Sequence, residues 1–273
     1  MSTRPFILVC NDDGVYAPGI KHLWKALSET ADLAVIAPAF EQSATALSIT
    51  VRRPLHVETI YWPKEEIEVR SVNGTPADCI KLALNVLLPR YPDFIVSGIN
   101  RGSNIGRNVL YSGTVAAVIE GVMHGVPGVA FSASDYSDPA YFECEEFIVQ
   151  VMHYLIKHPL ASGTFLNVNF PYKAQGKIRG VRLAEQGKEY WIESPEQRSH
   201  PFEGSPYYWL GGKTATFKEK KTSDVECLKA GYAAATPIQI NDLTDHAMIA
   251  KEKEQFDTYF QKGAEIKDFS YST

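Results

Sequence analysis

Two adjacent carboxylates follow the first apolar segment of the chain. Asp12 and Asp13 stand in the turn Asn11-Asp12-Asp13-Gly14, directly after the continuous apolar run Phe6–Cys10. Neighbouring carboxylates repel each other and are costly to remove from water, so the pair needs solvent, a helix N-terminus or a cation beside it. A turn in which one aspartate caps the next helix is the alternative, but it explains only one of the two carboxylates.

Further oxygen-bearing side chains follow two later apolar segments. Ser43 stands in the loop after Leu33–Ala37, where a serine by itself is an ordinary turn or cap residue. Asn100 and Asn104 belong to the glycine-rich stretch Ser97–Gly106, which predicts a loop with left-handed residues and inward-facing backbone amides. The stretch has neither the GxGxxG fingerprint of dinucleotide-binding proteins nor the GK[ST] ending of a P-loop.

The start of a helix adds hydrogen-bond donors to this set. Ser112, Gly113 and Thr114 introduce an apolar helical run that continues to Met123. Hydroxyl groups and free backbone N–H groups at a helix start form an anion-binding site. Ordinary N-capping is the alternative, and it would be favoured if this segment stood alone.

The candidate ligands all bind through oxygen. Oxygen atoms of Asp, Ser and Asn select a hard cation such as Mg²⁺, Mn²⁺ or Ca²⁺. The seven histidines are scattered and form neither HxH nor HExxH, which argues against a histidine-rich zinc site. A hard cation beside an anion-binding helix start is typical of phosphate chemistry.

The elements that position these residues alternate between apolar strands and amphipathic helices. Thr75-Pro76 has the N-cap and first-position residues of a helix. Strands are predicted at Phe6–Cys10, Leu33–Ala37, Phe94–Val96, Gly128–Phe131 and Phe165–Val168, and other helices at Pro18–Thr30, Thr114–Met123 and Phe142–Lys157. This alternation predicts an α/β fold with a doubly wound, mostly parallel sheet, in which ligands bind at the carboxyl ends of the strands.

The pattern changes after about Gly176. Glu189–Leu210 is rich in Tyr, Trp, Pro and Ser, which predicts irregular strands and loops. Such an extension either makes subunit contacts or folds as a hairpin over its own core, and the sequence favours neither. A charged helical run from Thr244 to Lys262 is expected to end near Gly263.

We therefore expect a single domain over residues 1–273. Its parts are an α/β core at about 1–185, a hairpin extension at about 186–240 and a C-terminal segment at 241–273.

Composition narrows the classes of partner and location. The chain has 273 residues, 27 basic and 32 acidic side chains and a formal net charge of −5, so binding to a nucleic-acid polymer is not expected. The first residues lack a signal-peptide pattern, and no apolar run approaches the roughly 20 residues of a membrane-spanning helix. The four scattered cysteines have no paired spacing, so we expect a reduced, cytoplasmic protein without membrane contact.

Five blocks of this sequence resemble the survival protein E (SurE) family of nucleotidases. They are Ile7–Ile20, Asn73–Cys79, the central block Ser97–Gly106 with Tyr111–Val115, the NVNxP segment Asn167–Pro171, and the GYxxxTP element Gly231–Pro237. The blocks stand in the family's order and span nearly the whole chain.

The resemblance implies the site and its activity. The family's metal ligands correspond to Asp12, Asp13, Ser43 and Asn100, which implies one divalent ion per subunit, Mg²⁺ or Mn²⁺. It implies a phosphomonoesterase acting on nucleoside 5′- and 3′-monophosphates, and some members also act on short polyphosphate. The family has a Rossmann-like core with a projecting hairpin and a C-terminal segment exchanged between subunits, so a homodimer or homotetramer is expected.

This sequence departs from the family pattern around the pocket. Residues 39–42 lack the basic residues that many members have there, Ala44 replaces a frequent glycine, and Arg107-Asn108 stands where some members are acidic. These departures concern substrate preference and leave the expected metal ligands unchanged.

A mechanism follows as a hypothesis. Asp12, Asp13 and Asn100 are the catalytic candidates, and an activated water attacks the phosphoryl group in line. Asn104, Ser112, Gly113 and Thr114 are the phosphate-binding candidates. A nucleophilic aspartate of the haloacid-dehalogenase type is the internal rival, although that type needs DxD rather than the adjacent pair. The alternative from another class is a non-catalytic nucleotide-binding module on the same scaffold.

Overall fold

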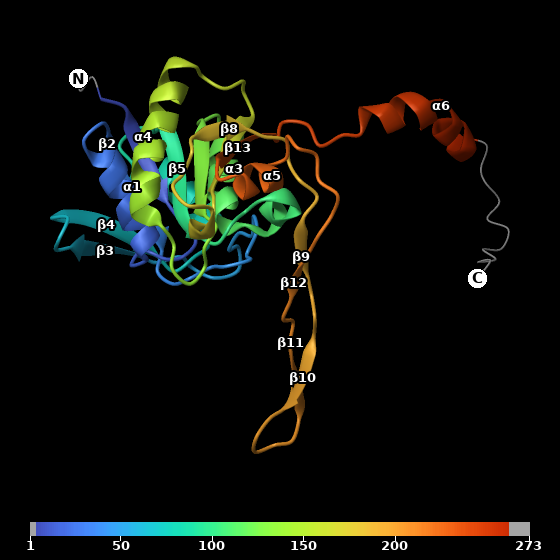
Figure 1. Cartoon of the computed structure of the whole chain (residues 1–273), viewed down its shortest axis with the longest axis horizontal. Coiled ribbons are helices and arrows are strands. Elements are labelled where there is room, and N and C mark those ends of the chain that lie inside the picture. Colours follow the sequence, from blue (N-terminus) through green and yellow to red (C-terminus); the bar gives the residue numbers. More distant parts are fainter. Residues whose placement is uncertain (1–3, 262–273) are drawn as a thin grey trace. The chain divides into compact units, whose positions relative to one another are not determined.

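The computed structural model of the protein describes residues 4–261. Within these residues the largest element is a nine-stranded sheet with the order β3-β4-β2-β1-β5-β6-β7-β13-β8 (Figure 1). Its strands are β1 (Phe6–Cys10), β2 (Asp32–Pro38), β3 (Val57–Trp62), β4 (Ile67–Val72), β5 (Phe94–Arg101), β6 (Gly128–Ala133), β7 (Thr164–Phe170), β8 (Val181–Leu183) and β13 (Ala233–Gln239). The six strands from β4 to β7 in this order are parallel, whereas β3 and β13 are antiparallel to β4 and β7.

Helices cover both faces of the sheet. On one face α1 (Pro18–Ser28) packs against α4 (Tyr141–Lys157), and on the other α2 (Pro76–Leu82) packs against α3 (Gly113–Met123). Along β1, Ile7 and Val9 belong to the first apolar core and Leu8 and Cys10 to the second, which is why this strand is continuously apolar. The predicted doubly wound, mostly parallel α/β fold is confirmed.

Shorter elements complete the core. A π-helical turn (η1, Ala83–Leu87) extends α2, and 3₁₀ turns form at Gly106–Tyr111 (η2) and Lys173–Gln175 (η3). Helix α5 (Asp224–Lys229) leads into β13. The four cysteines of the chain are buried and have free thiols.

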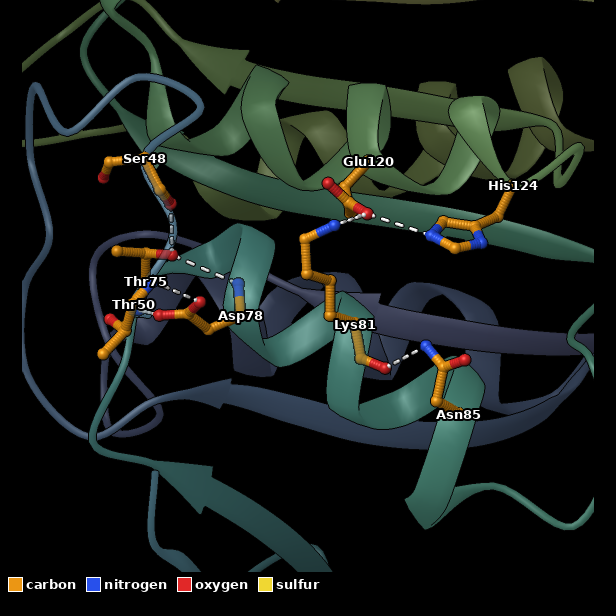
Figure 2. A network of polar contacts seen from close by, with 8 residues as sticks. All are labelled: Ser48, Thr50, Thr75, Asp78, Lys81, Asn85, Glu120 and His124. Carbon is orange, nitrogen blue, oxygen red and sulfur yellow. Dashed lines mark hydrogen bonds and ion pairs between the residues drawn. The ribbon is translucent and has the colours of Figure 1, made fainter. Parts of the chain in front are cut away.

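The start of α2 agrees with the sequence prediction. Thr75 is the N-cap and Pro76 the first helical residue. The Thr75 hydroxyl accepts a hydrogen bond from the Asp78 backbone N–H at 3.1 Å, and the Asp78 carboxylate accepts one from the Thr75 backbone N–H at 2.9 Å (Figure 2). This reciprocal pair is a capping box, which satisfies two otherwise unpaired donors.

Strand β5 is longer than predicted. We expected a strand at Phe94–Val96 and then a loop, but the strand continues to Arg101. A shift in register between Ser97 and Asn100 lets Asn100 and Arg101 pair again, opposite Ser132 and Ala133 of β6. Asn100 therefore lies on the end of a strand and not in a free loop.

The sequence analysis did not predict the β3–β4 pair. Most residues of β3 are exposed, because this strand forms one edge of the sheet, and it therefore lacks the apolar run that marks a central strand.

A long antiparallel ribbon leaves the core between β8 and α5 (Figure 1). Its strands are β9 (Tyr190–Ile192) paired with β12 (Lys213–Ala215), and β10 (Glu196–Ser199) paired with β11 (Pro206–Trp209). The predicted projecting hairpin is thus present. The range expected for the extension, 186–240, also contains α5 and β13, and β13 lies between β7 and β8 in the main sheet.

The last part of the chain is a separate compact unit that begins at Asn241, after a first unit that ends at Ile240. Its helix α6 spans His246–Gln261. The expected helix end near Gly263 lies outside the described residues. In the range 4–261, no helix is both long and apolar enough to cross a membrane.

Candidate active site

The carboxyl ends of three neighbouring parallel strands position the candidate ligands. Strand β1 lies between β2 and β5, so the turn after β1, the loop after β2 and the end of β5 meet at one edge of the sheet. The Gln42 backbone N–H donates to the Asp12 carbonyl oxygen at 2.7 Å, which fastens the β2 loop to the β1 turn. The Arg101 backbone N–H donates to Asp13 Oδ2 at 3.1 Å, which fastens the end of β5 to the same turn.

Asp12 is buried against the start of α3. The Thr114 hydroxyl donates a hydrogen bond to Asp12 Oδ1. Gly113 makes this approach possible, since a Cβ atom there would lie 2.7 Å from Asp12 Cβ and 2.9 Å from Asp12 Oδ2. The local sequence Gly113-Thr114 therefore brings a helix N-terminus, with its partial positive charge, against the carboxylate.

Both carboxylates have raised pKa values. Burial raises the pKa of Asp12 to about 7, the neighbouring charge of Asp13 adds to this, and hydrogen bonds from Thr114 oppose it. Burial raises the pKa of Asp13 to about 6, with Glu41 adding to the rise and Arg101 opposing it. The pair therefore lacks a positive charge sufficient to offset its own, which is what a cation would provide.

Among the described residues, no hydrogen bond joins the exposed side chain of Ser43 to Asp12 or Asp13. Its hydroxyl donates to Glu41 Oε1 at 2.6 Å, and Glu41 Oε2 lies 3.3 Å from Arg101 Nη2. Ser43 is thus linked to the rest of the site through Glu41 and Arg101. Ala44, the next residue, has φ of 56°, a left-handed conformation that explains why glycine is suited to this position.

The two asparagines of the central block have different surroundings. Asn100 Nδ2 donates to the Gly102 carbonyl at 2.8 Å, so the amide nitrogen is held by the backbone and the amide oxygen is the atom suited to a cation. Asn104 is buried, and its Nδ2 donates to Ser132 Oγ at 2.8 Å. One amide hydrogen of this predicted phosphate ligand is therefore engaged within the protein.

The backbone of Asn104 is held by the NVN segment of β7. The Asn104 N–H donates to Asn169 Oδ1 at 2.7 Å, and the Asn167 side chain donates to the Asn104 carbonyl at 2.7 Å. These contacts fix the loop that leads to α3, and they give this sequence block a structural role at the site.

Ser112 caps α3. Its hydroxyl accepts a hydrogen bond from the Val115 backbone N–H at 3.1 Å, which is the N-capping alternative considered above. The helix start still directs donors at the carboxylates, because the Thr114 backbone N–H as well as its hydroxyl lowers the pKa of Asp12. Gly113 and Thr114 are thus the predicted phosphate-binding residues that lie against Asp12.

The donor set fits a hard divalent cation. It comprises two carboxylates with uncompensated charge, an amide oxygen and a hydroxyl, all from oxygen-bearing side chains. Within residues 4–261, no three or more His, Cys, Asp or Glu side chains are arranged to hold a metal ion. A set with only two carboxylates, completed by Ser43 and Asn100, does not require such a group.

Sequence reasoning missed three side chains of this region: Glu41, Arg101 and Tyr141. The Arg101 guanidinium lies 4.4 Å from the centre of the Tyr136 ring, in addition to its contact with Glu41. Tyr141, the first residue of α4, is buried, and burial followed by the charge of Asp13 raises its pKa. Glu41 lies in the loop after β2, Arg101 ends β5 and Tyr141 begins α4, and single charged or aromatic residues at such positions are too common to be singled out from the sequence.

Comparison with known proteins identifies the family of the chain. The family model described as survival protein SurE matches residues 7–193. A protein of Protochlamydia amoebophila named 5′-nucleotidase SurE is 56% identical over 259 residues, which cover 95% of this chain and 99% of the relative. A protein of the same name from Heliobacterium modesticaldum is 40% identical over 243 residues, 89% of each chain.

A solved structure has the same fold. The crystal structure of the SurE protein from Aquifex aeolicus has a TM-score of 0.77 and 31% sequence identity, and the match covers 93% of this chain and 100% of that one. The match therefore extends over the sheet that carries the site as well as the later elements. This chain belongs to the survival protein SurE family.

Proposed function

We propose that this protein is a divalent-metal-dependent 5′-nucleotidase that hydrolyses nucleoside 5′-monophosphates to a nucleoside and phosphate. The names of the relatives support the reaction. The observation that carries the metal dependence is the pair of carboxylates after β1, the buried Asp12 and the half-buried Asp13, whose pKa values are raised to about 7 and about 6.

The residues have distinct roles in this proposal. Asp12, Asp13, Ser43 and Asn100 would hold one Mg²⁺ or Mn²⁺ ion, which as a Lewis acid would polarise a phosphoryl oxygen and acidify a water molecule. Thr114 holds Asp12 through its hydroxyl hydrogen bond. The backbone donors of Gly113 and Thr114 at the start of α3 would bind phosphate oxygens, as helix N-termini do.

The substrate range is the finer part of the proposal. Nucleoside 3′-monophosphates and short polyphosphate would present the same phosphoryl group to the same residues, so we include them as further substrates. Asn104 is then a residue that supports the loop between β5 and α3, and Ser112 one that caps α3.

Assembly and location complete the proposal. Exposed aromatic residues on the ribbon, Trp191, Phe202, Tyr207, Tyr208 and Trp209, support a homodimer or homotetramer, because aromatic side chains are enriched in interfaces. The four free cysteine thiols support a reducing, cytoplasmic location.

The test is phosphate release from AMP in the presence of Mn²⁺ and in the presence of EDTA. We expect release with Mn²⁺ and none above background with EDTA. Asp12→Asn should lower kcat/KM by more than about a hundredfold, since loss of a partner outside the metal shell alone typically costs 10- to 100-fold. Asp257→Asn is the control, because this partly exposed carboxylate on α6 forms an ion pair with Lys253 and belongs to the unit that starts at Asn241, whereas the site residues belong to the first unit.

Two outcomes would contradict the proposal. Equal rates in Mn²⁺ and EDTA would exclude metal dependence. Binding of AMP without phosphate release under either condition would instead favour the non-catalytic nucleotide-binding module.

A further inference from the structure

Glu41 joins two of the segments that form the candidate site. One of its carboxylate oxygens, Oε1, accepts the Ser43 hydroxyl hydrogen at 2.6 Å, and the other, Oε2, lies 3.3 Å from Arg101 Nη2. Ser43 belongs to the loop after β2, whereas Arg101 ends β5. Because Glu41 and Ser43 share the loop after β2, the Oε1 bond orders this loop and the Oε2 contact connects it to the end of β5.

Arg101 carries this connection to the aspartates. Its backbone N–H donates to Asp13 Oδ2 at 3.1 Å. Its guanidinium is held on another side by the ring of Tyr136, at 4.4 Å from the ring centre. Arg101 is thus held at its backbone and at its side chain, and it presents a fixed cation to Glu41.

The hydrogen bond that Ser43 donates to Glu41 orients the Ser43 hydroxyl group, and this orientation determines whether its oxygen can bind a cation. A hydroxyl group has one proton and two lone pairs. With the proton directed to Glu41, the lone pairs of Ser43 Oγ are free to bind a cation. If Glu41 did not accept this proton, the hydroxyl would rotate freely and the ligand would have to be ordered on each binding event.

Within residues 4–261, the hydrogen bonds and the ion pair of the Glu41 side chain involve only Ser43 and Arg101. Glu41 is an exposed loop residue. An exposed ion pair by itself adds little stability. The negative charge of Glu41 adds to the rise in the pKa of Asp13, and the charge of Arg101 opposes this rise.

We infer that Glu41 is a positioning residue for the metal site: it accepts the Ser43 proton and thereby directs the Ser43 oxygen to the divalent cation, while Arg101 holds Glu41 in place. The inference rests on the proposed function, since it assigns a role toward the cation that Asp12, Asp13, Ser43 and Asn100 would hold. The inference predicts that two variants that both remove the charge of Glu41 differ in their effect on metal binding. Glutamine keeps an oxygen that can accept the Ser43 proton, whereas alanine does not.

The experiment measures Mn²⁺ binding to the full chain by titration calorimetry, with Mn²⁺ alone as the probe. We compare Glu41→Ala, Glu41→Gln, Ser43→Ala and the double variant Glu41→Ala/Ser43→Ala. Glu226→Gln is the matched control, because Glu226 is a partly exposed carboxylate in an ion pair with Lys229 on α5. Thermal unfolding of each variant establishes that it is folded.

We expect Glu41→Ala to weaken Mn²⁺ binding by about tenfold, which is the usual effect of removing a partner of a metal ligand. Glu41→Gln should stay within about threefold of the unmutated protein. The double variant should bind as Ser43→Ala does, because a residue that acts through Ser43 has no effect once the hydroxyl is gone. In AMP hydrolysis, the Mn²⁺ concentration for half-maximal rate should rise in Glu41→Ala while kcat at saturating Mn²⁺ changes little.

Other results would overturn the inference. Equal losses in Glu41→Ala and Glu41→Gln, or additive losses in the double variant, would mean that Glu41 acts through its charge. Unchanged Mn²⁺ binding in Glu41→Ala would mean that it has no role at the site. If the unmutated protein bound no Mn²⁺, the proposed function would fail together with this inference, whereas the previous outcomes leave the proposed function intact.

Discussion

Asp12 lies against the first turn of α3 and Asp78 lies within the first turn of α2; both are buried, yet their pKa values shift in opposite directions. Burial raises the pKa of Asp12 to about 7, and the Thr114 hydrogen bonds only partly oppose this. Burial also acts to raise the pKa of Asp78, but hydrogen bonds from Thr50 and Thr75 outweigh it and the pKa is lowered.

The surrounding donors explain the difference. Asp78 accepts hydrogen bonds from the backbone N–H groups of Thr50 and Thr75, each at 2.9 Å, and it closes a capping box (Figure 2). Asp12 has a second carboxylate, Asp13, next to it in the chain. A buried carboxylate with enough donors stabilises the fold, whereas one with a like charge beside it stores unfavourable energy that a bound cation relieves.

A glycine lies against each carboxylate, so a methyl group added at either glycine would displace the neighbouring aspartate. A Cβ atom at Gly113 would lie 2.7 Å from Asp12 Cβ, and one at Gly74 would lie 2.7 Å from Asp78 Oδ2. Gly113→Ala should lower kcat/KM for AMP by about 10- to 100-fold, because a displacement near 1 Å at a reacting site has a cost of this order. Gly74→Ala should instead lower the free energy of unfolding by about 1–3 kcal/mol.

Steady-state kinetics and denaturant unfolding of the two variants test this contrast. Kinetics are corrected for the folded fraction, so Gly74→Ala should have an unchanged kcat/KM. A loss of activity in Gly74→Ala of the same size as in Gly113→Ala would remove the distinction between the two carboxylates.

Removing each charge should change stability in opposite directions. In EDTA at pH 8, Asp12→Asn should raise the free energy of unfolding by roughly 2–4 kcal/mol, because each pKa unit corresponds to about 1.4 kcal/mol and the ionised form of Asp12 is disfavoured in the folded state. The gain should vanish near pH 4, below which Asp12 is protonated in both states. Asp78→Asn should lower stability at pH 8 by about 2 kcal/mol, as expected for hydrogen bonds to a charged group.

Urea unfolding at the two pH values measures both differences. Destabilisation by Asp12→Asn at pH 8 without metal would show that the protein itself compensates the Asp12 charge. That result would make Asp12 a structural residue like Asp78.

The smallest expected effect is in the acid range. Because the pKa of Asp78 is lowered by folding, its contribution to stability is present above its unfolded value and is lost as pH falls through the folded value. Between pH 6 and pH 3 the unmutated protein should therefore lose more stability than Asp78→Asn, by on the order of 1 kcal/mol. Thermal unfolding across this range measures the difference, and parallel curves for the two proteins would contradict the assignment.

Some elements could be predicted from short stretches of sequence, because a capping residue, a proline or an apolar run marks where they begin or end. The Thr75-Pro76 start of α2 follows from N-cap and proline preferences, and β1 follows from an apolar run with both faces buried. The positions of Asp12 and Asp13 after β1 follow as well, because the carboxyl ends of parallel strands share one edge of the sheet.

Contacts between segments far apart in the sequence could not be predicted from short stretches of sequence. Strand β13 enters the sheet beside β7 in the antiparallel direction, which the βα pattern of the first half does not predict. The surroundings of Asn104 are set by Asn167 and Asn169, more than 60 residues further along the chain. Glu41 is an exposed loop residue in the sequence, and only its contacts with Ser43 and Arg101 distinguish it.

The sequence by itself determined five parallel strands (β1, β2, β5, β6 and β7) and the helices between them, the oxygen-bearing residues near the strand ends and their resemblance to the SurE family, because these depend on residue type and short spacing. The tertiary structure determined in which carboxylates the ionised form is stabilised, as in Asp78, and in which it is destabilised, as in Asp12 and Asp13. Asp12, Asp13 and Asp78 are the same residue type, and the burial, hydrogen-bond donors and charges that the fold gives each one set its pKa.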